Sequence, residues 1–315
     1  MRKARKKYLV LVPRRSLQTS LGLICLLFII TVLSNSTGAQ PAPPSASQPI
    51  NLPTVHIDHD GLKKLNWQLL VEPTAAGDAT IFDAIDHLHA MVVHHIDLVE
   101  GQPISPEQMD VVLDLNLPAD QATALLAKVQ SVHMDFVTLS VTDEMSTETQ
   151  CRKALDLAKK LKVKRIVCQP TGDALPLLDH LTAEYRIGIS IVNHADGPYK
   201  DPTAILSALQ GHTPLIGACA DLAEFHRAGI VPLEAVQKLA GHLLDVRLSD
   251  VDSQGAIVGI GSGTIDAAAI LKEIKNQKFK GGVTLGPADA ARSVGSFIES
   301  VNAFSDMVGK LASGG

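Results

Sequence analysis

The sequence has few aromatic residues and no strong excess of either charge. Aromatic residues make up 3% of the 315 residues, which argues against the stacking surfaces that bind single-stranded nucleic acid and against aromatic-lined sugar clefts. The formal net charge is -5, and no run rich in Lys or Arg lies beyond the N-terminus. A basic surface for nucleic acid is therefore excluded, and we expect no nucleic-acid partner.

Cysteine is also scarce. Cys25 lies in an apolar N-terminal run, and the three others, Cys151, Cys168 and Cys219, are widely spaced without a C-x-x-C pair. An odd, scattered set does not indicate a disulfide framework or a zinc cluster. We predict that these three thiols pack as small apolar side chains.

No apolar run is long enough to cross a bilayer without difficulty. Residues 21–33 form a 13-residue apolar run after the basic start M-R-K-A-R-K-K-Y, whereas a membrane span needs roughly 20 residues. This run suits the core of a signal peptide, and Thr37-Gly38-Ala39 permits cleavage before Gln40. An uncleaved membrane anchor is the alternative. We expect residues 1–39 to direct export to the periplasm or the medium, and any membrane contact to be through this segment alone.

The rest of the chain divides into a linker and one domain. The start of residues 40–62 is rich in Pro, Ser, Ala and Gln, with no apolar period, which indicates a flexible linker. Residues 63–312 alternate between short apolar runs rich in β-branched residues and segments of helical spacing. The predicted strands cover residues 67–71, 95–100, 135–141, 165–169, 188–193, 216–220, 243–248 and 282–285.

Eight such strands, each followed by a helix, predict an α/β fold of the (β/α)8 TIM-barrel type. A doubly wound open sheet is the alternative, but its glycine-rich turn after the first strand is missing. In a (β/α)8 barrel the active site lies at the carboxyl ends of the strands. The polar residues at those ends are Glu72, Glu100, Asp143, Glu144, Gln169, His194, Asp221, Glu224, Arg247 and Asp250.

One segment carries a family resemblance. It reads I-G-A-C-A-D-L-A-E-F-H-R-A-G-I-V-P-L-E-A-V from position 216, followed by L-L-D-V-R-L-S-D up to position 250. This resembles the xylose isomerase-like TIM-barrel family of sugar phosphate isomerases and epimerases. Weaker matches lie before and after this segment, in the order in which the family has them. Examples are R-I-V-C-Q-P at 165–170 and G-I-G-S-G-T-I-D at 259–266. The positions that fit the main pattern are Asp221, Arg227, Gly229, Pro232, Glu234 and Asp250.

The resemblance implies a divalent cation at the strand ends, held by Glu, Asp and His side chains. A cation bound to substrate oxygens stabilises an enediolate while carboxylates move the proton. Most of the implied ligand positions are replaced here, by Gln169, Val192, Glu224, Arg247 and Gly286. Asp221 and His194 remain, with Glu224 as the third ligand if any metal binds. No cofactor is therefore favoured, and Mn, Mg, Co or Zn is expected only if catalysis survives.

These substitutions lead to a hypothesis about the site. Without a cation, we expect the Arg247 guanidinium to pair with Asp221 on the adjacent strand, because a buried carboxylate needs a partner. The candidate ligand-binding residues are Glu100, Gln169, His194, Asp221, Glu224 and Arg247.

Three functions fit the sequence. The first is an exported protein of this family with a degenerate metal site, which binds a small carbohydrate-like ligand without metal-dependent isomerisation. The second is an active isomerase, epimerase or lyase with a rearranged site. The third is a structural barrel that presents loops to a protein partner. The sequence indicates neither a catalytic residue nor an oligomeric state.

Overall fold

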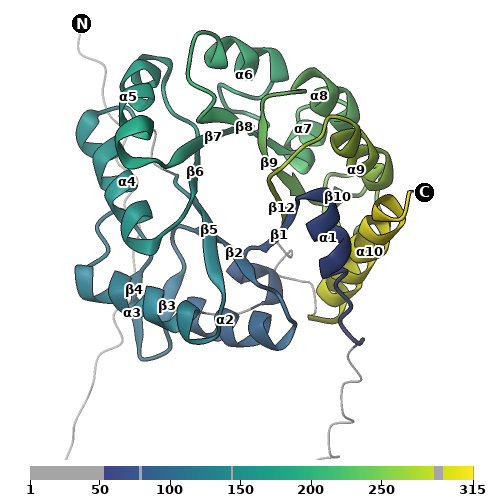
Figure 1. The fold of residues 1–315 in the computed structure, drawn as a ribbon, viewed down its shortest axis with the longest axis horizontal. Coiled ribbons are helices and arrows are strands. Elements are labelled where there is room, and N and C mark those ends of the chain that lie inside the picture. The colour runs from purple at the N-terminus through teal and green to yellow at the C-terminus, as the bar shows by residue number, and fades with distance from the viewer. Residues whose placement is uncertain (1–52, 78–79, 143–144, 287–293, 315) are drawn as a thin grey trace, which may run out of the picture. The chain divides into compact units, whose positions relative to one another are not determined.

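The computed structural model describes residues 53–77, 80–142, 145–286 and 294–314. Eight parallel strands form a closed barrel in the order β1-β12-β9-β8-β7-β6-β5-β2, and helices surround this ring (Figure 1). The strands are β1 Gln68–Val71, β2 His95–Val99, β5 Asp135–Ser140, β6 Arg165–Cys168, β7 Gly188–Val192, β8 Ile216–Asp221, β9 Leu243–Leu248 and β12 Gly282–Leu285. The predicted (β/α)8 barrel is confirmed, and the bounds of every predicted strand agree to within one residue.

The helices follow the strands in the expected alternation. The α-helices are α1 His59–Leu65, α2 Ile81–Ala90, α3 Ala119–Ser131, α4 Glu148–Leu161, α5 Leu175–Tyr185, α6 Pro202–Leu209, α7 Leu222–Arg227, α8 Pro232–Lys238, α9 Ala267–Asn276 and α10 Val294–Ala312. The 3-10 turns are η1 Pro73–Ala76 and η2 Gly172–Ala174. Two short hairpins lie in loops outside the barrel sheet. One pairs β3 Pro103–Ser105 with β4 Gln108–Val112, and the other pairs β10 Asp250–Val251 with β11 Ile257–Val258.

Helix α4 shows how the sequence sets these elements. Its start is fixed by a capping box. The Thr147 hydroxyl accepts a hydrogen bond from the Gln150 N–H, and the Gln150 side chain accepts one from the Thr147 N–H. Leu155 and Leu161 lie among its fully buried residues, so one face packs on the barrel. The helix ends where Lys162 adopts a left-handed conformation.

The inside of the barrel is unusually polar for a packed core. Arg165 on β6 donates two hydrogen bonds to Asp245 on β9, at 2.7 and 2.6 Å, and the Ser190 hydroxyl donates to the same carboxylate at 2.6 Å. Two strands lie between β6 and β9 in the barrel order, so the ion pair crosses the interior. A second interior pair joins Arg247 to Asp97 at 2.9 Å. Each of these four charged side chains therefore has a partner of opposite charge, as buried charges require.

The ordered body starts earlier than the predicted end of the linker. The Asp58 N–H donates to the Ser305 hydroxyl of α10 at 2.7 Å, and the Asn302 side chain donates to the Thr54 carbonyl at 2.9 Å. Part of the range 53–62 that was assigned to the linker thus packs on α10.

The predicted signal or anchor segment, residues 1–39, lies outside the described residues. Among the helices that the structure describes, none combines the length and apolarity needed to span a bilayer. Cys151, Cys168 and Cys219 are free and buried, which confirms the prediction that they pack as small apolar side chains.

Candidate functional site

A cavity of about 220 Å³ opens at the carboxyl ends of the strands. This volume is below the roughly 300–1,000 Å³ usual for sites of drug-sized ligands, so the cavity fits a small molecule. Nine of the fourteen described residues that line it are polar or charged, and none of the fourteen is Phe, Tyr or Trp. The polar residues that matter most are Glu72, Asn193, His194, Asp221, Glu224 and Arg247.

Arg247 provides the permanent positive charge of the cavity. Its Nη2 donates to Asp97 Oδ2 at 2.9 Å and to the Ser140 hydroxyl at 2.5 Å, and it lies 3.6 Å from Glu72 Oε1. Burial works against its charge, but Asp97 and Glu72 outweigh burial and raise the pKa of Arg247. The Arg247 side chain is 17% exposed, and its Nε has no hydrogen-bond acceptor in the described part of the chain. The guanidinium therefore keeps donor capacity beside the cavity.

Glu72 follows strand β1 and is buried close to this guanidinium. Burial raises the pKa of Glu72 to about 7, and the neighbouring Arg247 limits the rise, whereas Asp97 and Asp221 add to it. Near neutral pH this carboxyl group exchanges readily between its charged and neutral forms. Such a group in a cavity is typical of proton-transfer sites.

Asp221 is held by the start of helix α7. One of its oxygens accepts the Glu224 N–H at 3.1 Å, so Asp221 is the N-cap of the helix. Its backbone N–H donates to Asn193 at 2.7 Å, and Asn193 donates back to the Asp221 carbonyl at 2.8 Å. Burial raises the pKa of Asp221, although Arg247 and the Glu224 N–H lower it.

Glu224 is largely occupied by its neighbours. One oxygen accepts from Arg227 at 2.6 Å, and the other accepts from the Ala195 N–H at 2.9 Å. The His194 ring lies 3.3 Å from Glu224 but is 60% exposed and contacts Asp196 at 2.8 Å. His194 and Glu224 thus form the outer rim of the cavity.

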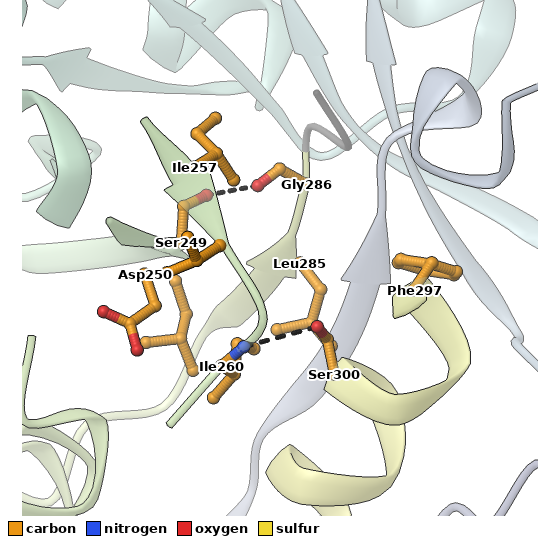
Figure 2. A pocket seen from close by; sticks show the side chains of 10 residues that line it. Ser249, Asp250, Ile257, Ile260, Leu285, Gly286, Phe297 and Ser300 are labelled. Carbon is orange, nitrogen blue, oxygen red and sulfur yellow. Dashed lines mark hydrogen bonds between the residues drawn. The ribbon is translucent and has the colours of Figure 1, made fainter. Parts of the chain in front are cut away.

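The end of β12 is fixed close to this site. The Ser249 hydroxyl donates a short hydrogen bond to the Gly286 carbonyl, which Figure 2 shows beside a small internal hollow of about 20 Å³. In the same view the Ile260 N–H donates to Ser300 of α10, so the loop after β11 is tied to the last helix. These bonds hold the backbone at Gly286 in place beside Glu72.

The structure separates the predicted ligand-binding residues into two groups. His194, Asp221, Glu224 and Arg247 line the cavity. Glu100 instead accepts from the N–H and hydroxyl of Thr142 and borders a different surface hollow.

The remaining strand-end residues also lie elsewhere. Gln169 donates to the Val192 carbonyl at 3.0 Å and is absent from the cavity wall. Asp250 is buried and accepts four backbone N–H groups, from Val251, Gly261, Gly263 and Ile265. Asp250 therefore shapes a turn. Asp143 and Glu144 lie outside the described residues.

The hypothesis of an Arg247–Asp221 ion pair is wrong. The register places Asp221 opposite Arg247 on adjacent strands, but the Asp221 carboxylate turns to cap α7. The guanidinium instead reaches across the barrel to Asp97 on β2, a residue outside the predicted set.

The donor set does not fit a family-type divalent cation. Among the described residues, no group of three or more His, Cys, Asp or Glu side chains is arranged to hold a metal ion. Arg247 lies among the carboxylates and repels a cation, while Glu224 already binds Arg227. A divalent ion prefers several free oxygen ligands, which this arrangement does not offer.

Comparisons with known proteins support the fold. No protein-family model matches the sequence, and no curated protein matches it. Among solved structures, an uncharacterised protein from Parabacteroides distasonis is similar with a TM-score of 0.62 at 20% identity, covering 76% of this chain and 99% of that one. A xylose isomerase-like TIM-barrel protein from Mycobacterium smegmatis, in complex with magnesium, has a TM-score of 0.62 at 12% identity and covers 79% and 99%. A D-psicose 3-epimerase in the presence of D-fructose has a TM-score of 0.60 at 9% identity and covers 79% and 100%.

Proposed function

Because the chain has the xylose isomerase-like TIM-barrel fold, we propose that its cavity binds a small carbohydrate-like ligand without the metal-dependent isomerisation of that superfamily. The size of the cavity and its polar wall support a small polyhydroxy compound. Carboxylates accept hydrogen bonds from hydroxyl groups, and Glu72 and Asp221 present such acceptors from opposite sides of Arg247 in the barrel order.

The observation that carries the proposal is the position of Arg247. A guanidinium bonded to Asp97 and close to Glu72 supplies positive charge at the mouth of the barrel. It donates hydrogen bonds to carbonyl and hydroxyl oxygens but cannot take up a lone pair as a metal does. Ligand binding should therefore need no metal.

Ketohexoses are the first ligands to test, because one structural neighbour is a D-psicose 3-epimerase in the presence of D-fructose. A ligand at 100 times its Kd stabilises a protein by about 2.7 kcal/mol, which raises the Tm by roughly 5–10 °C at this size. We expect one sugar of a panel to raise the Tm to this extent, equally with and without EDTA. A rise that EDTA abolishes would contradict the metal-free site.

A matched pair of variants locates the binding. Asp221→Asn keeps an N-cap residue on α7 but removes the charge that faces the cavity, and we expect it to weaken binding at least tenfold. Asp266→Asn is the control, because Asp266 caps α9 in the same way outside the cavity. If the two variants bind the sugar equally well, the ligand does not occupy this cavity. If no sugar shifts the Tm of the wild-type protein, the proposal fails in favour of a structural barrel.

A further inference from the structure

Gly286 lacks a side chain because Glu72 fills the space. A Cβ atom at position 286 would lie 2.9 Å from both Cγ and Cδ of Glu72 and 3.0 Å from its Oε2. Atoms of folded proteins do not approach so closely without a shift of one of them. Any side chain at 286 and the present position of Glu72 therefore exclude each other.

Position 286 is where the resembled family carries its last-strand glutamate. Strands β1 and β12 are hydrogen-bonded neighbours, with Val71 opposite Leu285, so positions 72 and 286 follow side by side. A carboxyl group thus fills the space beside position 286, and it belongs to the residue that follows β1.

The relocated carboxyl group has an arginine as its neighbour. Glu72 Oε1 lies 3.6 Å from Arg247 Nη2, and both side chains line the same cavity. The 3.6 Å separation is longer than a hydrogen bond, and in the described part of the chain the Nε of Arg247 has no acceptor. A proton acceptor and a fixed cation therefore face one small ligand space.

We propose that Glu72 has taken over the acid–base role of a last-strand carboxylate and, with Arg247 as the fixed cation, transfers a proton of a ketose without a metal. This proposal rests on the proposed carbohydrate ligand. In this role Glu72 is a catalytic residue, and Asp97 is a positioning residue that orients Arg247.

The step balances without any further reactant. The Glu72 carboxylate takes the hydrogen from the carbon next to the ketose carbonyl as a proton. The electron pair of the broken C–H bond forms the carbon–carbon double bond of an enediolate, and the carbonyl electrons move onto its oxygen beside Arg247. The protonated Glu72 then returns its proton to carbon, and Arg247 keeps its charge throughout.

Solvent exchange tests the step directly. The wild-type protein is incubated with its sugar in D2O and EDTA, and deuterium at the carbons next to the carbonyl is measured by NMR. We expect incorporation that rises with pH through about 7, where Glu72 loses its proton. In Glu72→Gln, incorporation should fall at least 100-fold even at sugar concentrations that saturate the variant, because the amide keeps an acceptor oxygen but takes up no proton.

Glu107→Gln is the matched control, because Glu107 is exposed and outside the cavity. It should exchange as the wild type does. If the wild type binds the sugar but incorporates no deuterium, or if Glu72→Gln keeps full exchange, the proton-transfer proposal is overturned while ligand binding stands. If no sugar binds, the proposed function itself has failed.

A double-mutant cycle tests the relocation independently of any ligand. Gly286→Ala should lower the Tm by roughly 3–10 °C through overpacking against Glu72, and adding Glu72→Gly should recover most of the loss. Gly282→Ala on the same strand is the control, since its Cβ would meet Asp245 and Leu70 instead. Its loss should not be recovered by Glu72→Gly. Equal recovery at both positions, or none at 286, would show that Glu72 does not occupy the 286 side-chain space.

Discussion

At the scale of single residues, the site depends on carboxyl groups whose charge is costly. Glu72 and Asp221 are both buried at the cavity, and burial raises the pKa of each. Arg247 limits this rise but is shared with Asp97. Both carboxyl groups therefore bind a proton more tightly than exposed ones do, at the place where a ligand would enter.

The raised pKa of Glu72 has a measurable effect on stability. The folded state holds its proton up to about pH 7, whereas the unfolded chain releases it near 4.5. The folded state therefore binds more protons between these values, and its contribution to stability is lost as the pH rises through this window. We expect the Tm of the wild type to fall relative to that of Glu72→Gln between pH 5 and about 8. Asp221 is present in both proteins, so its own burial affects both alike.

Thermal unfolding of both proteins at several pH values checks this, with Glu107→Gln expected to follow the wild type throughout. A Tm difference between wild type and Glu72→Gln that stays constant with pH would show that Glu72 titrates normally.

The candidate site could be predicted from the sequence only in part. Asp221, Glu224 and His194 were found because they follow strands, and strand ends converge at one mouth. The partner of Arg247 could not be found this way, because a long side chain crosses the barrel to Asp97, far away in the sequence. The contact between Glu72 and Gly286 was also hidden, since it depends on side-chain direction and not on order along the chain.

At the scale of elements, the strands were predictable and the small hairpins were not. The barrel strands are short apolar runs that helices cover on one face, so their limits are visible in the sequence. Hairpin β3–β4 pairs a largely exposed strand, Gln108–Val112, and has no such apolar signal. Hairpin β10–β11 has two residues in each strand. Its geometry comes from Asp250, whose four accepted N–H bonds organise the following turn.

This turn gives a prediction at the element scale. Asp250→Asn leaves one acceptor oxygen in place of two, so buried N–H groups of the turn lose their partner. We expect a loss of roughly 2–4 kcal/mol in the free energy of unfolding. The control Asp252→Asn affects the N–H groups of Gln254 and Ala256 in an exposed turn and should cost less than about 1 kcal/mol. Urea unfolding of both variants measures the difference, and equal losses would show that Asp250 does not organise the turn.

At the scale of the whole molecule, the chain shares its fold with a D-psicose 3-epimerase at 9% identity and with an uncharacterised protein at 20% identity. A shared fold at such distance does not establish shared chemistry. The chemistry depends on the residues at the mouth of the barrel, where the Arg247 guanidinium lies among carboxylates.

Export is the prediction that belongs to this scale. We propose that residues 1–39 direct the barrel out of the cytoplasm, because a basic start precedes a short apolar run and a small-residue cleavage site. Expression of the full chain in a bacterium, followed by fractionation and N-terminal sequencing, should give an exported protein that starts at Gln40. A membrane-bound chain starting at Met1 would indicate the anchor instead, and an intact chain in the cytoplasm would contradict export. A chain without residues 1–39 is the control, and it should stay in the cytoplasm.

The mutual exclusion between Glu72 and a side chain at 286 constrains how this protein can evolve. Introducing a glutamate at position 286 by one substitution would overpack the mouth and reduce stability before any benefit arose. Losing Glu72 first would remove the carboxylate that fills the space beside position 286. The two positions must therefore change together, so single substitutions at either position are disfavoured.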